Sequence, residues 1–248
     1  MDNLVRKIKP QIIIQVRMGS TRLPSKVMMP INGVPMIGYQ IERLLQTGIP
    51  IIVATSDNKN NDSLVNYLES FGVDIFRGSE DNVLERYFNA AKLYEASDII
   101  RITGDNPLIN ADFITKQLDM FSPKTNRYYL HEGPHRKLPL GLSFEMFSID
   151  LLEEAYKEAQ TKGEIEHVTP YMHQNMPGDI EMLEFNIDIN YPDARLTVDT
   201  MKDFKLIEEL IIKHQCHLKN TDEIVKILKD NSVLLQMNID VSQKKWNE

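Results

Sequence analysis

The chain has 248 residues, a net charge of −8, 42% hydrophobic residues and one cysteine. This length suffices for one large core or two modest ones, whereas the negative charge argues against a nucleic-acid binder, which needs broad basic patches. The single cysteine excludes an intramolecular disulfide and a cysteine-rich zinc site, and no apolar run approaches the roughly 18 residues of a membrane span. No signal-peptide pattern is present, so we expect a cytoplasmic protein that contacts neither membrane nor nucleic acid.

In the first half, short apolar runs alternate with stretches of helical spacing. We predict strands at 11–16, 50–55, 73–76 and 98–103 and helices at 35–45, 62–71 and 83–94. This alternation with short connections predicts βαβ units, and hence a mostly parallel sheet with helices on both faces. In such sheets ligands bind beyond the carboxyl ends of the strands. The polar segments that fall at those ends are 17–26, 55–57, 77–82 and 103–107.

The second half is less regular. We predict strands at 128–130, 142–147, 179–189 and 195–199 and helices at 150–160, 165–174 and 202–213. We expect a single domain over 10–230, in which about 125–195 complete the sheet and form a small inserted lid or dimerisation subdomain. Residues 231–248 show no clear pattern, and we expect a dimer contact or a loosely attached tail there.

The segment RMGSTRLPSK at 17–26 follows the first strand and has the composition of an anion cradle. Its backbone N–H groups can turn inward, and Gly19 allows unusual dihedral angles and a close approach. Arg17, Arg22 and Lys26 would add charge-assisted donors. The alternative is a solvated basic loop. The spacing matches neither a Walker A loop nor Gly-x-Gly-x-x-Gly, which disfavours a nicotinamide dinucleotide.

Two aspartates far apart in the chain stand in equivalent settings. Asp105, in TGDNP, and Asp199, in LTVDT, each come directly after an apolar strand. Two such carboxylates would suit one Mg²⁺ that also binds substrate phosphates. The alternatives are that Asp105 closes an Asx-turn and that Asp199 is the N-cap of the following helix.

Five blocks of sequence, in order, carry a resemblance to a known family: QVRMGSTRLPSKV, RGSEDNVLERY, RITGDNPLI, EHVTPYM and RLTVDT. Together they resemble the cytidylyltransferases of the spore-coat-polysaccharide type, which are similar to CMP-sialic-acid and CMP-KDO synthetases. The resemblance spans roughly residues 12–212. It implies an α/β, Rossmann-like nucleotidyltransferase fold with a mostly parallel sheet flanked by helices, and a homodimer.

The implied reaction depends on Mg²⁺ and transfers CMP from CTP to an acidic sugar or sugar phosphate for surface glycan biosynthesis. An acceptor oxygen attacks the α-phosphorus and pyrophosphate leaves. Three alternatives stay open. The first is the same chemistry with GTP or another NTP and an amino-sugar phosphate, and the second is a catalytically silent nucleotide-binding subunit of a glycan assembly complex. The third is a glycosyltransferase, although that class more typically carries an Asp-x-Asp motif.

Carried onto this sequence, the resemblance gives roles to individual residues. The implied catalytic residues are Arg22, Lys26 and Asp105, and the implied metal ligands are Asp105 and Asp199. The residues implied to hold the triphosphate are Arg17, Met18, Gly19, Ser20, Arg22 and Lys26. Position on the rim adds Thr55, Arg77, Asn82 and Thr103 as candidates for the nucleoside pocket.

The acceptor candidates are Glu145, Glu166 and His167. Glu145 aligns with a position that faces the acceptor in the family, and its alternative is a surface strand carboxylate. The alternative for His167 is a histidine satisfied within the helix packing. The chain also departs from the family pattern in two places. Ser25 stands where a glycine is frequent, which costs little if its dihedral angles are ordinary, and the basic segment 131–139 suggests contact with an anionic acceptor.

Overall fold

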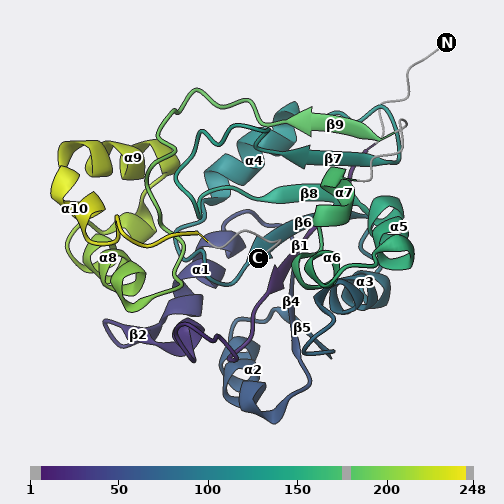
Figure 1. Ribbon diagram of the computed structural model, residues 1–248, viewed down its shortest axis with the longest axis horizontal. Helices are drawn as coiled ribbons and strands as arrows, with labels where there is room; N and C mark the ends of the chain where they lie inside the picture. Colours follow the sequence, from purple (N-terminus) through teal and green to yellow (C-terminus); the bar gives the residue numbers. More distant parts are fainter. Residues whose placement is uncertain (1–6, 175–179, 244–248) are drawn as a thin grey trace.

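A computed structural model describes residues 7–174 and 180–243 and contains a central sheet of seven strands (Figure 1). Strand β1 (Pro10–Gln15) pairs in parallel with β4 (Ile51–Ser56) and with β6 (Asp98–Thr103), and β5 (Asp74–Gly78) pairs in parallel with β4. On the other side, β8 (Glu145–Ser148) runs antiparallel to β6 and to β7 (Tyr128–His131), and β9 (Glu181–Glu184) runs parallel to β7. The order is β5-β4-β1-β6-β8-β7-β9, and six of these strands point the same way, as predicted.

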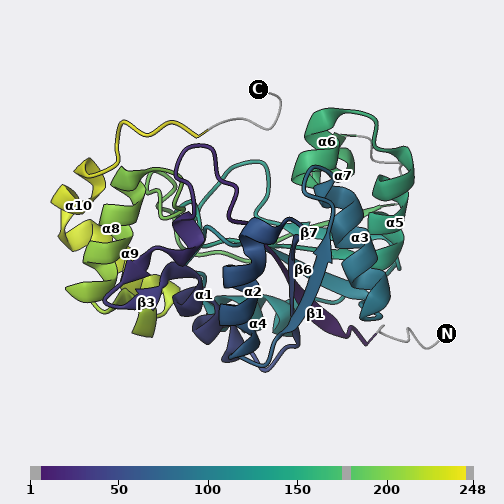
Figure 2. The ribbon, with the colours of Figure 1, turned by 90° about the horizontal axis from the view of Figure 1, so that it is seen from below.

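Helices cover both faces of the sheet (Figure 2). Side chains that alternate along β1 face opposite layers, because Ile13 belongs to one core cluster and Ile12 and Ile14 belong to the other. The Ile13 layer contains α3 (Val83–Leu93), α5 (Ile149–Glu158), α6 (Lys162–His167) and α7 (Pro170–Gln174). The opposite layer contains α1 (Met36–Leu45), α2 (Asp62–Glu69), α4 (Ala111–Met120), α8 (Met201–Ile212), α9 (Thr221–Asp230) and α10 (Ser232–Gln236).

Two predicted elements of the second half have the wrong extent. The single helix at 165–174 is instead the pair α6 and α7, because Val168 adopts a positive φ of 70° and the helical hydrogen bonds end there. The strand predicted at 179–189 is only the four residues of β9, and position 179 lies outside the described residues. Helices α4 and α9 were not predicted, and a small hairpin of β2 (Pro30–Ile31) and β3 (Val34–Pro35) precedes α1.

The segment 195–199 is not the predicted strand, because it forms an isolated bridge at Arg195 and bends at Thr197 and Asp199. Its backbone bonds to two loops, with Leu196 N donating to Leu140 O at 2.7 Å and Val198 N donating to Asp105 O at 2.9 Å. Apolar alternation in the sequence does not distinguish these partners from a sheet ladder. The consequence is functional, because the bond between Val198 and Asp105 brings two distant parts of the chain to the same place.

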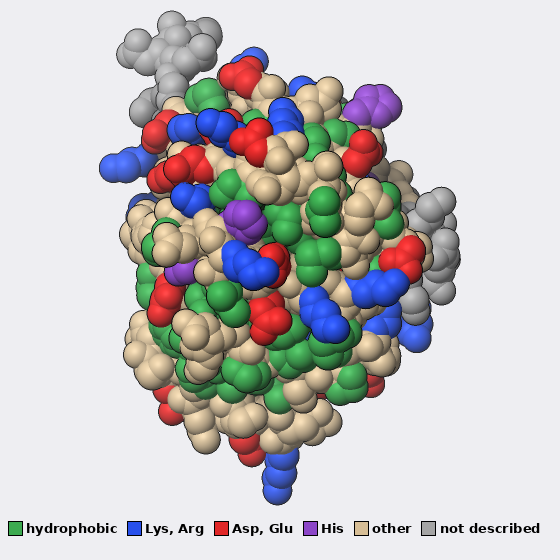
Figure 3. Space-filling view, turned by 90° about the vertical axis from the view of Figure 1, so that its left-hand side faces the viewer, with side chains coloured by type: hydrophobic (Ala, Val, Ile, Leu, Met, Phe, Trp, Pro, Cys, Tyr) green, Lys and Arg blue, Asp and Glu red, His purple; other side chains and the backbone are tan. Residues whose placement is uncertain are grey.

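The C-terminal part turns back toward the middle of the molecule. After α10 the chain crosses in front of the fold (Figure 1), and Asn238 is buried at 4% exposure. Up to residue 243 this part is held at the buried Leu234 and Asn238, while most of its other residues are exposed, and 244–248 lie outside the described residues. The dimer contact there stays a prediction. On the face formed by this part, cationic and anionic side chains are interspersed (Figure 3). Within the described residues, no helix is long and apolar enough to cross a membrane.

Candidate active site

The phosphate loop, as we call residues 17–26, leaves the carboxyl end of β1 and folds on itself. Ser25 N donates to Met18 O at 3.1 Å, and Met18 N donates to the side chain of the fully buried Asn61 at 2.9 Å. The turn is completed by Ser25, whose φ of 58° lies in the left-handed region. A short 3₁₀ helix, Lys26–Met28, follows directly and fixes where the Lys26 side chain starts.

Four N–H groups of the phosphate loop stay available. Those of Arg17, Gly19, Thr21 and Arg22 find no acceptor among the residues that the structure describes, whereas those of Ser20 and Leu23 bond within the loop. Free N–H groups on consecutive residues, beside cationic side chains, are the feature of an anion nest. The loop is therefore suited to the anion that its composition predicts.

Gly19 lies close to a neighbouring carboxylate. Its φ is outside the left-handed region, so that part of the expectation is wrong and Ser25 takes the unusual conformation instead. A Cβ on Gly19 would lie 3.0 Å from Glu80 Oε1, and the expected close approach to a bound anion stays a prediction. The same oxygen accepts from Arg17 Nη1 at 2.8 Å, so Glu80 holds Arg17 against the loop.

Lys26 lies between the two aspartates. Its Nζ is 2.9 Å from Asp199 Oδ1 and 3.3 Å from Asp105 Oδ2, and it donates to Val198 O at 2.6 Å. The side chains of Lys26 and Asp199 are each only 10% exposed, and that of Asp105 is 25% exposed. These three residues therefore lie together at one rim, as the sequence predicts.

Asp199 is surrounded by three cations. Arg22 Nη2 lies 2.9 Å and Arg195 Nη2 lies 2.6 Å from its Oδ2, opposite the contact of Oδ1 with Lys26. Burial alone would raise the pKa of the Asp199 carboxyl, but Lys26, followed by Arg22 and Arg195, outweighs burial and holds that pKa below its ordinary value. Asp199 is thus a carboxylate at neutral pH.

Neither local alternative for the aspartates describes this structure. The N-cap of α8 is Thr200, in a capping box with Asp203, so Asp199 is not the cap. Asp105 directs its carboxylate to side chains, accepting from Thr103 Oγ1 at 2.6 Å and from Lys26, and it does not close an Asx-turn. Both carboxylates therefore face the shared ammonium group.

The nucleoside candidates differ in where they lie. Thr55 is fully buried, so its side chain does not line the surface of the site in this structure. Asn82 accepts from Glu85 N at 2.9 Å as the N-cap of α3, which accounts for its side chain locally. Arg77 pairs with Asp62 at 2.7 Å. Thr103, bonded to Asp105, is the one of the four that lies at the aspartates. All four roles stay predictions.

The acceptor candidate Glu145 is not a surface carboxylate. Its side chain is 20% exposed and forms an ion pair with Arg101 on the neighbouring strand β6. Burial would raise its pKa, but Arg101 and hydrogen bonds from His173 and Tyr129 hold it far below the ordinary range. Arg101 also donates to Gln15 at 3.1 Å, which places this cluster beside the start of the phosphate loop.

His167 and Glu166 lie at the end of α6. His167 is exposed, so the alternative of a histidine satisfied within the helix packing is wrong, and Glu166 is half-buried. In the segment 131–139, the Arg136 guanidinium bonds to Pro192 O at 2.7 Å. His131 stacks on Tyr129, with ring centroids 5.0 Å apart. Acceptor contact by these parts stays a prediction.

Several residues of the site were missed by the sequence reasoning. Glu80 and Arg195 lie inside quoted blocks, yet a charge within a block does not reveal its partner across the fold. Asp203 has a local signal, because it stands three residues after Thr200 in capping-box spacing. Gln40, which is fully buried and donates to Thr103 O at 2.8 Å, and Asn238 have no local signal at all.

The donor set at the aspartates fits Mg²⁺ bound together with phosphates. Asp105 and Asp199 supply two carboxylates within reach of one ammonium group. The described part of the chain contains no cluster of three or more His, Cys, Asp or Glu side chains that would hold a metal alone. Mg²⁺ typically uses one or two carboxylates and takes its other ligands from substrate phosphates and water, so two are enough.

Comparisons with known proteins agree with this geometry. The family model described as "Cytidylyltransferase" matches residues 11–246. An uncharacterized protein of Methanocaldococcus jannaschii is 40% identical over 242 residues, which cover 95% of this chain and 97% of that protein. A spore coat polysaccharide biosynthesis protein of Bacillus subtilis is 32% identical over 211 residues, covering 81% and 85%. The structure of a cytidylyltransferase from Leptospira borgpetersenii matches with a TM-score of 0.85 and 28% identity, over 96% of this chain and 100% of that one. Together these findings confirm the fold and the resemblance, and the chain belongs to the cytidylyltransferase family.

Proposed function

We propose that this enzyme transfers CMP from CTP to an acidic sugar or a sugar phosphate, with Mg²⁺ and with release of pyrophosphate, for surface glycan biosynthesis. The observation that carries the proposal is Lys26, held between Asp105 and Asp199 next to a loop with free N–H groups. This arrangement combines donors for a triphosphate with ligands for a divalent cation. The homodimer and the cytoplasmic location stay predictions.

In this proposal the chain acts by positioning and by neutralising charge. Attack on the α-phosphorus increases negative charge on its oxygens and on the departing pyrophosphate, and such transfers need little covalent help from the protein. Lys26 and Arg22, now paired with Asp199, are the cations close enough to turn toward those oxygens. The free N–H groups of the loop would bind the rest of the triphosphate.

Asp105 and Asp199 are the residues that would hold Mg²⁺. The ion would neutralise phosphate charge and lower the pKa of an acceptor hydroxyl. Thr103, which donates to Asp105 Oδ1 at 2.6 Å, leaves the other oxygen of that carboxylate facing Lys26. Turning of Lys26 toward the triphosphate would free an oxygen on each aspartate at once.

The acceptor would lie on the side of the Glu145 cluster. Arg101 and Thr103 are two residues apart on β6 and therefore share a face of the sheet. Glu145 pairs with Arg101 and Asp105 with Thr103, so the Glu145 cluster and the aspartates are neighbours. Glu145, with Tyr129 and a half-exposed His173, offers hydrogen-bond donors and acceptors suited to sugar hydroxyls. The resemblance to synthetases that activate sugar acids supports an acidic acceptor.

Pyrophosphate release tests the proposal directly. The purified enzyme is incubated with Mg²⁺, each of the four NTPs, and a panel of sugar acids, sugar phosphates and amino-sugar phosphates. We expect release with CTP and an acidic sugar or sugar phosphate. We expect Lys26→Ala and Asp105→Asn to remain folded and to lose about 10²–10³ in kcat, the usual cost of one charged transition-state contact.

Lys157→Ala is the matched control, because Lys157 also pairs with a carboxylate but lies exposed on α5. Its kcat is expected to equal that of the wild type. Preference for GTP with an amino-sugar phosphate would replace the CTP assignment. Absence of release with any combination would indicate a silent nucleotide-binding subunit, and full activity of Lys26→Ala would refute the site.

A further inference from the structure

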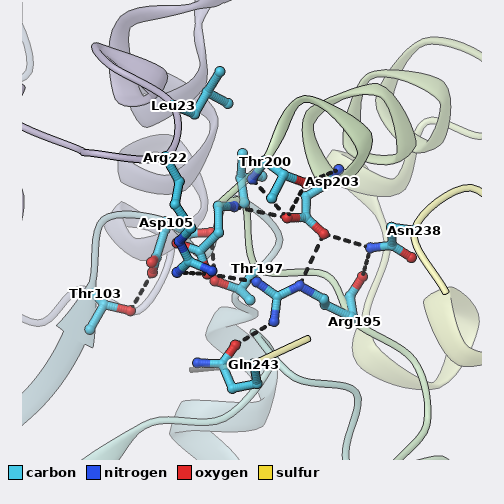
Figure 4. A network of polar contacts seen from close by, with 12 residues as sticks. Arg22, Leu23, Thr103, Asp105, Arg195, Thr197, Thr200, Asp203, Asn238 and Gln243 are labelled. Atoms are coloured by element: carbon cyan, nitrogen blue, oxygen red, sulfur yellow. Dashed lines mark hydrogen bonds and ion pairs between the residues drawn. The ribbon is translucent and has the colours of Figure 1, made fainter. Parts of the chain in front are cut away.

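The three cations around Asp199 are held in different ways. Figure 4 shows one of them, Arg195, with its partners Asp203 and Gln243. Arg22 and Lys26 belong to the phosphate loop, and the Arg22 side chain is 31% exposed. Arg195 is only 9% exposed, and each of its guanidinium nitrogens has a partner. Nη2 contacts Asp199 at 2.6 Å, Nε contacts Asp203 at 3.0 Å, and Nη1 donates to the Gln243 side chain.

The C-terminal segment, residues 238–243, contacts both the backbone and the side chain of Arg195. Asn238 Nδ2 donates to the backbone oxygen of Arg195 at 3.0 Å and to Asp203 Oδ1 at 2.8 Å. Asp203 is buried and accepts through Oδ2 from Asp199 N at 3.1 Å. The side chain and the backbone of Asp199 are thus both fixed by a network that ends in the last described residues of the chain.

We propose that Arg195 is a positioning residue for Asp199, and that the C-terminal segment keeps it in place through Asn238 and Gln243. The inference rests on the proposed function. When Arg22 and Lys26 turn toward a triphosphate, Asp199 loses two of its three counter-charges. Arg195, which is buried and fully partnered, would keep its contact with Asp199 Oδ2 in that state. Asp199 would then stay oriented with Oδ1, the oxygen that Lys26 leaves, available to the Mg²⁺.

The expected consequence is a defect in turnover and not in nucleotide binding. Partners that orient metal ligands without contacting the metal typically contribute 10- to 100-fold in metal affinity or activity. We expect Asn238→Ala and Gln243→Ala to lower kcat about tenfold and to raise the Mg²⁺ concentration for half-maximal rate by a similar factor. The KM for CTP should stay near that of the wild type, because the phosphate loop is unchanged.

Asp240→Ala is the matched control. Asp240 lies on the same segment and pairs with Lys202, but both side chains are more than half exposed and neither contacts Arg195. This variant should keep the wild-type kcat and Mg²⁺ dependence. Thermal melting shows whether each variant is folded, and Gln243→Ala, at an exposed position, serves if Asn238→Ala does not fold.

Hydrogen exchange supplies a readout that does not depend on activity. The Asp199 and Thr200 amides, both bonded to Asp203, should exchange faster in Asn238→Ala than in Asp240→Ala. Wild-type kcat and Mg²⁺ dependence in both Asn238→Ala and Gln243→Ala, or an equal loss in Asp240→Ala, would overturn the inference. An inactive wild type would refute the proposed function instead, and the exchange rates would then decide whether the segment fixes Asp199.

Discussion

At the scale of single residues, Ser25 shows how the phosphate loop brings Lys26 into place. Its φ of 58° reverses the chain just before Lys26, and its N–H closes the loop onto Met18 O. A left-handed conformation costs a residue with a side chain roughly 1–2 kcal/mol, a cost that glycine avoids. A serine at this position was expected to cost little stability only if its dihedral angles were ordinary. They are not, because its φ is positive.

Replacing Ser25 should therefore change stability in a predictable direction. We expect Ser25→Gly to raise the free energy of unfolding by up to about 1 kcal/mol, since glycine removes the strain but gains entropy in the unfolded chain. Ser25→Val should lower it, because a β-branched residue at positive φ is a true outlier. Urea denaturation measures both. A Ser25→Gly protein less stable than Ser25→Val would show that the loop has another conformation in solution.

At the scale of elements, the carboxyl ends of the strands and the following helix N-termini build the site. Thr200 with Asp203 caps α8, and Asn82 caps α3, each directly after a rim segment. A cap and a ligand contact use the same kind of side chain, so the sequence alone does not separate them. For Asp199 the structure separates them, because Thr200 is the cap.

The two roles, helix cap and nucleoside ligand, can be tested separately at Asn82. We expect Asn82→Ala to lose about 1 kcal/mol of stability, the usual value of an N-cap, and Asn82→Asp to keep it, since aspartate caps equally well. Stability comes from urea denaturation and nucleotide affinity from the KM for CTP. If Asn82 also binds the nucleoside through its amide, Asn82→Asp raises the KM while staying stable. An unchanged stability of Asn82→Ala would contradict the cap.

At the scale of the whole molecule, buried ion pairs join elements that are distant in sequence. Glu145 on β8 and Arg101 on β6 pair across the antiparallel junction where the first, parallel part of the sheet ends. Arg43 on α1 donates to backbone oxygens of Leu108, Ile109 and Lys219 and so joins three segments. Such contacts stabilise one arrangement, but removing one partner leaves a buried charge.

The Glu145 pair predicts how stability depends on pH. Its pKa in the folded chain lies below the unfolded value of about 4.3, so its contribution is present above that pH and is lost as the pH falls through the folded pKa. We expect Glu145→Gln to cost about 3 kcal/mol at pH 7, the low end for a buried pair because the side chain is 20% exposed. The difference from the wild type should shrink as the pH is lowered from about 5 to 2.

Urea denaturation of both proteins at several pH values measures this difference. Glu153→Gln, which breaks an exposed pair with Lys157, is the control and should leave the pH dependence unchanged. A stability difference between wild type and Glu145→Gln that is independent of pH would contradict the assignment of the pair.

The first half of the fold and the three central residues of the site follow from the sequence, because alternating strands and helices place their polar ends on one rim. Lys26, Asp105 and Asp199 are candidates there by residue type, although the local sequence leaves a turn or a helix cap open for the two aspartates. Asn238 and Glu80 are not, since their partners lie far away in the chain and an isolated Asn or Glu carries no periodic signal. The segment 195–199 has the pattern of a strand, yet its hydrogen-bond partners are loops, which only the three-dimensional fold decides.

The Glu80 carboxylate lies beside Gly19 and Arg17 and therefore affects which anions can bind to the phosphate loop. Glu80 forms an ion pair with Arg17, as Asp199 does with Lys26. Carboxylates of the chain itself therefore occupy cations that the proposed substrate would use. Orthophosphate or chloride offers few contacts, so we expect it to separate these pairs poorly. Under the proposed function, a nucleoside triphosphate would replace several of them at once, and we expect the loop to bind it in preference to small anions.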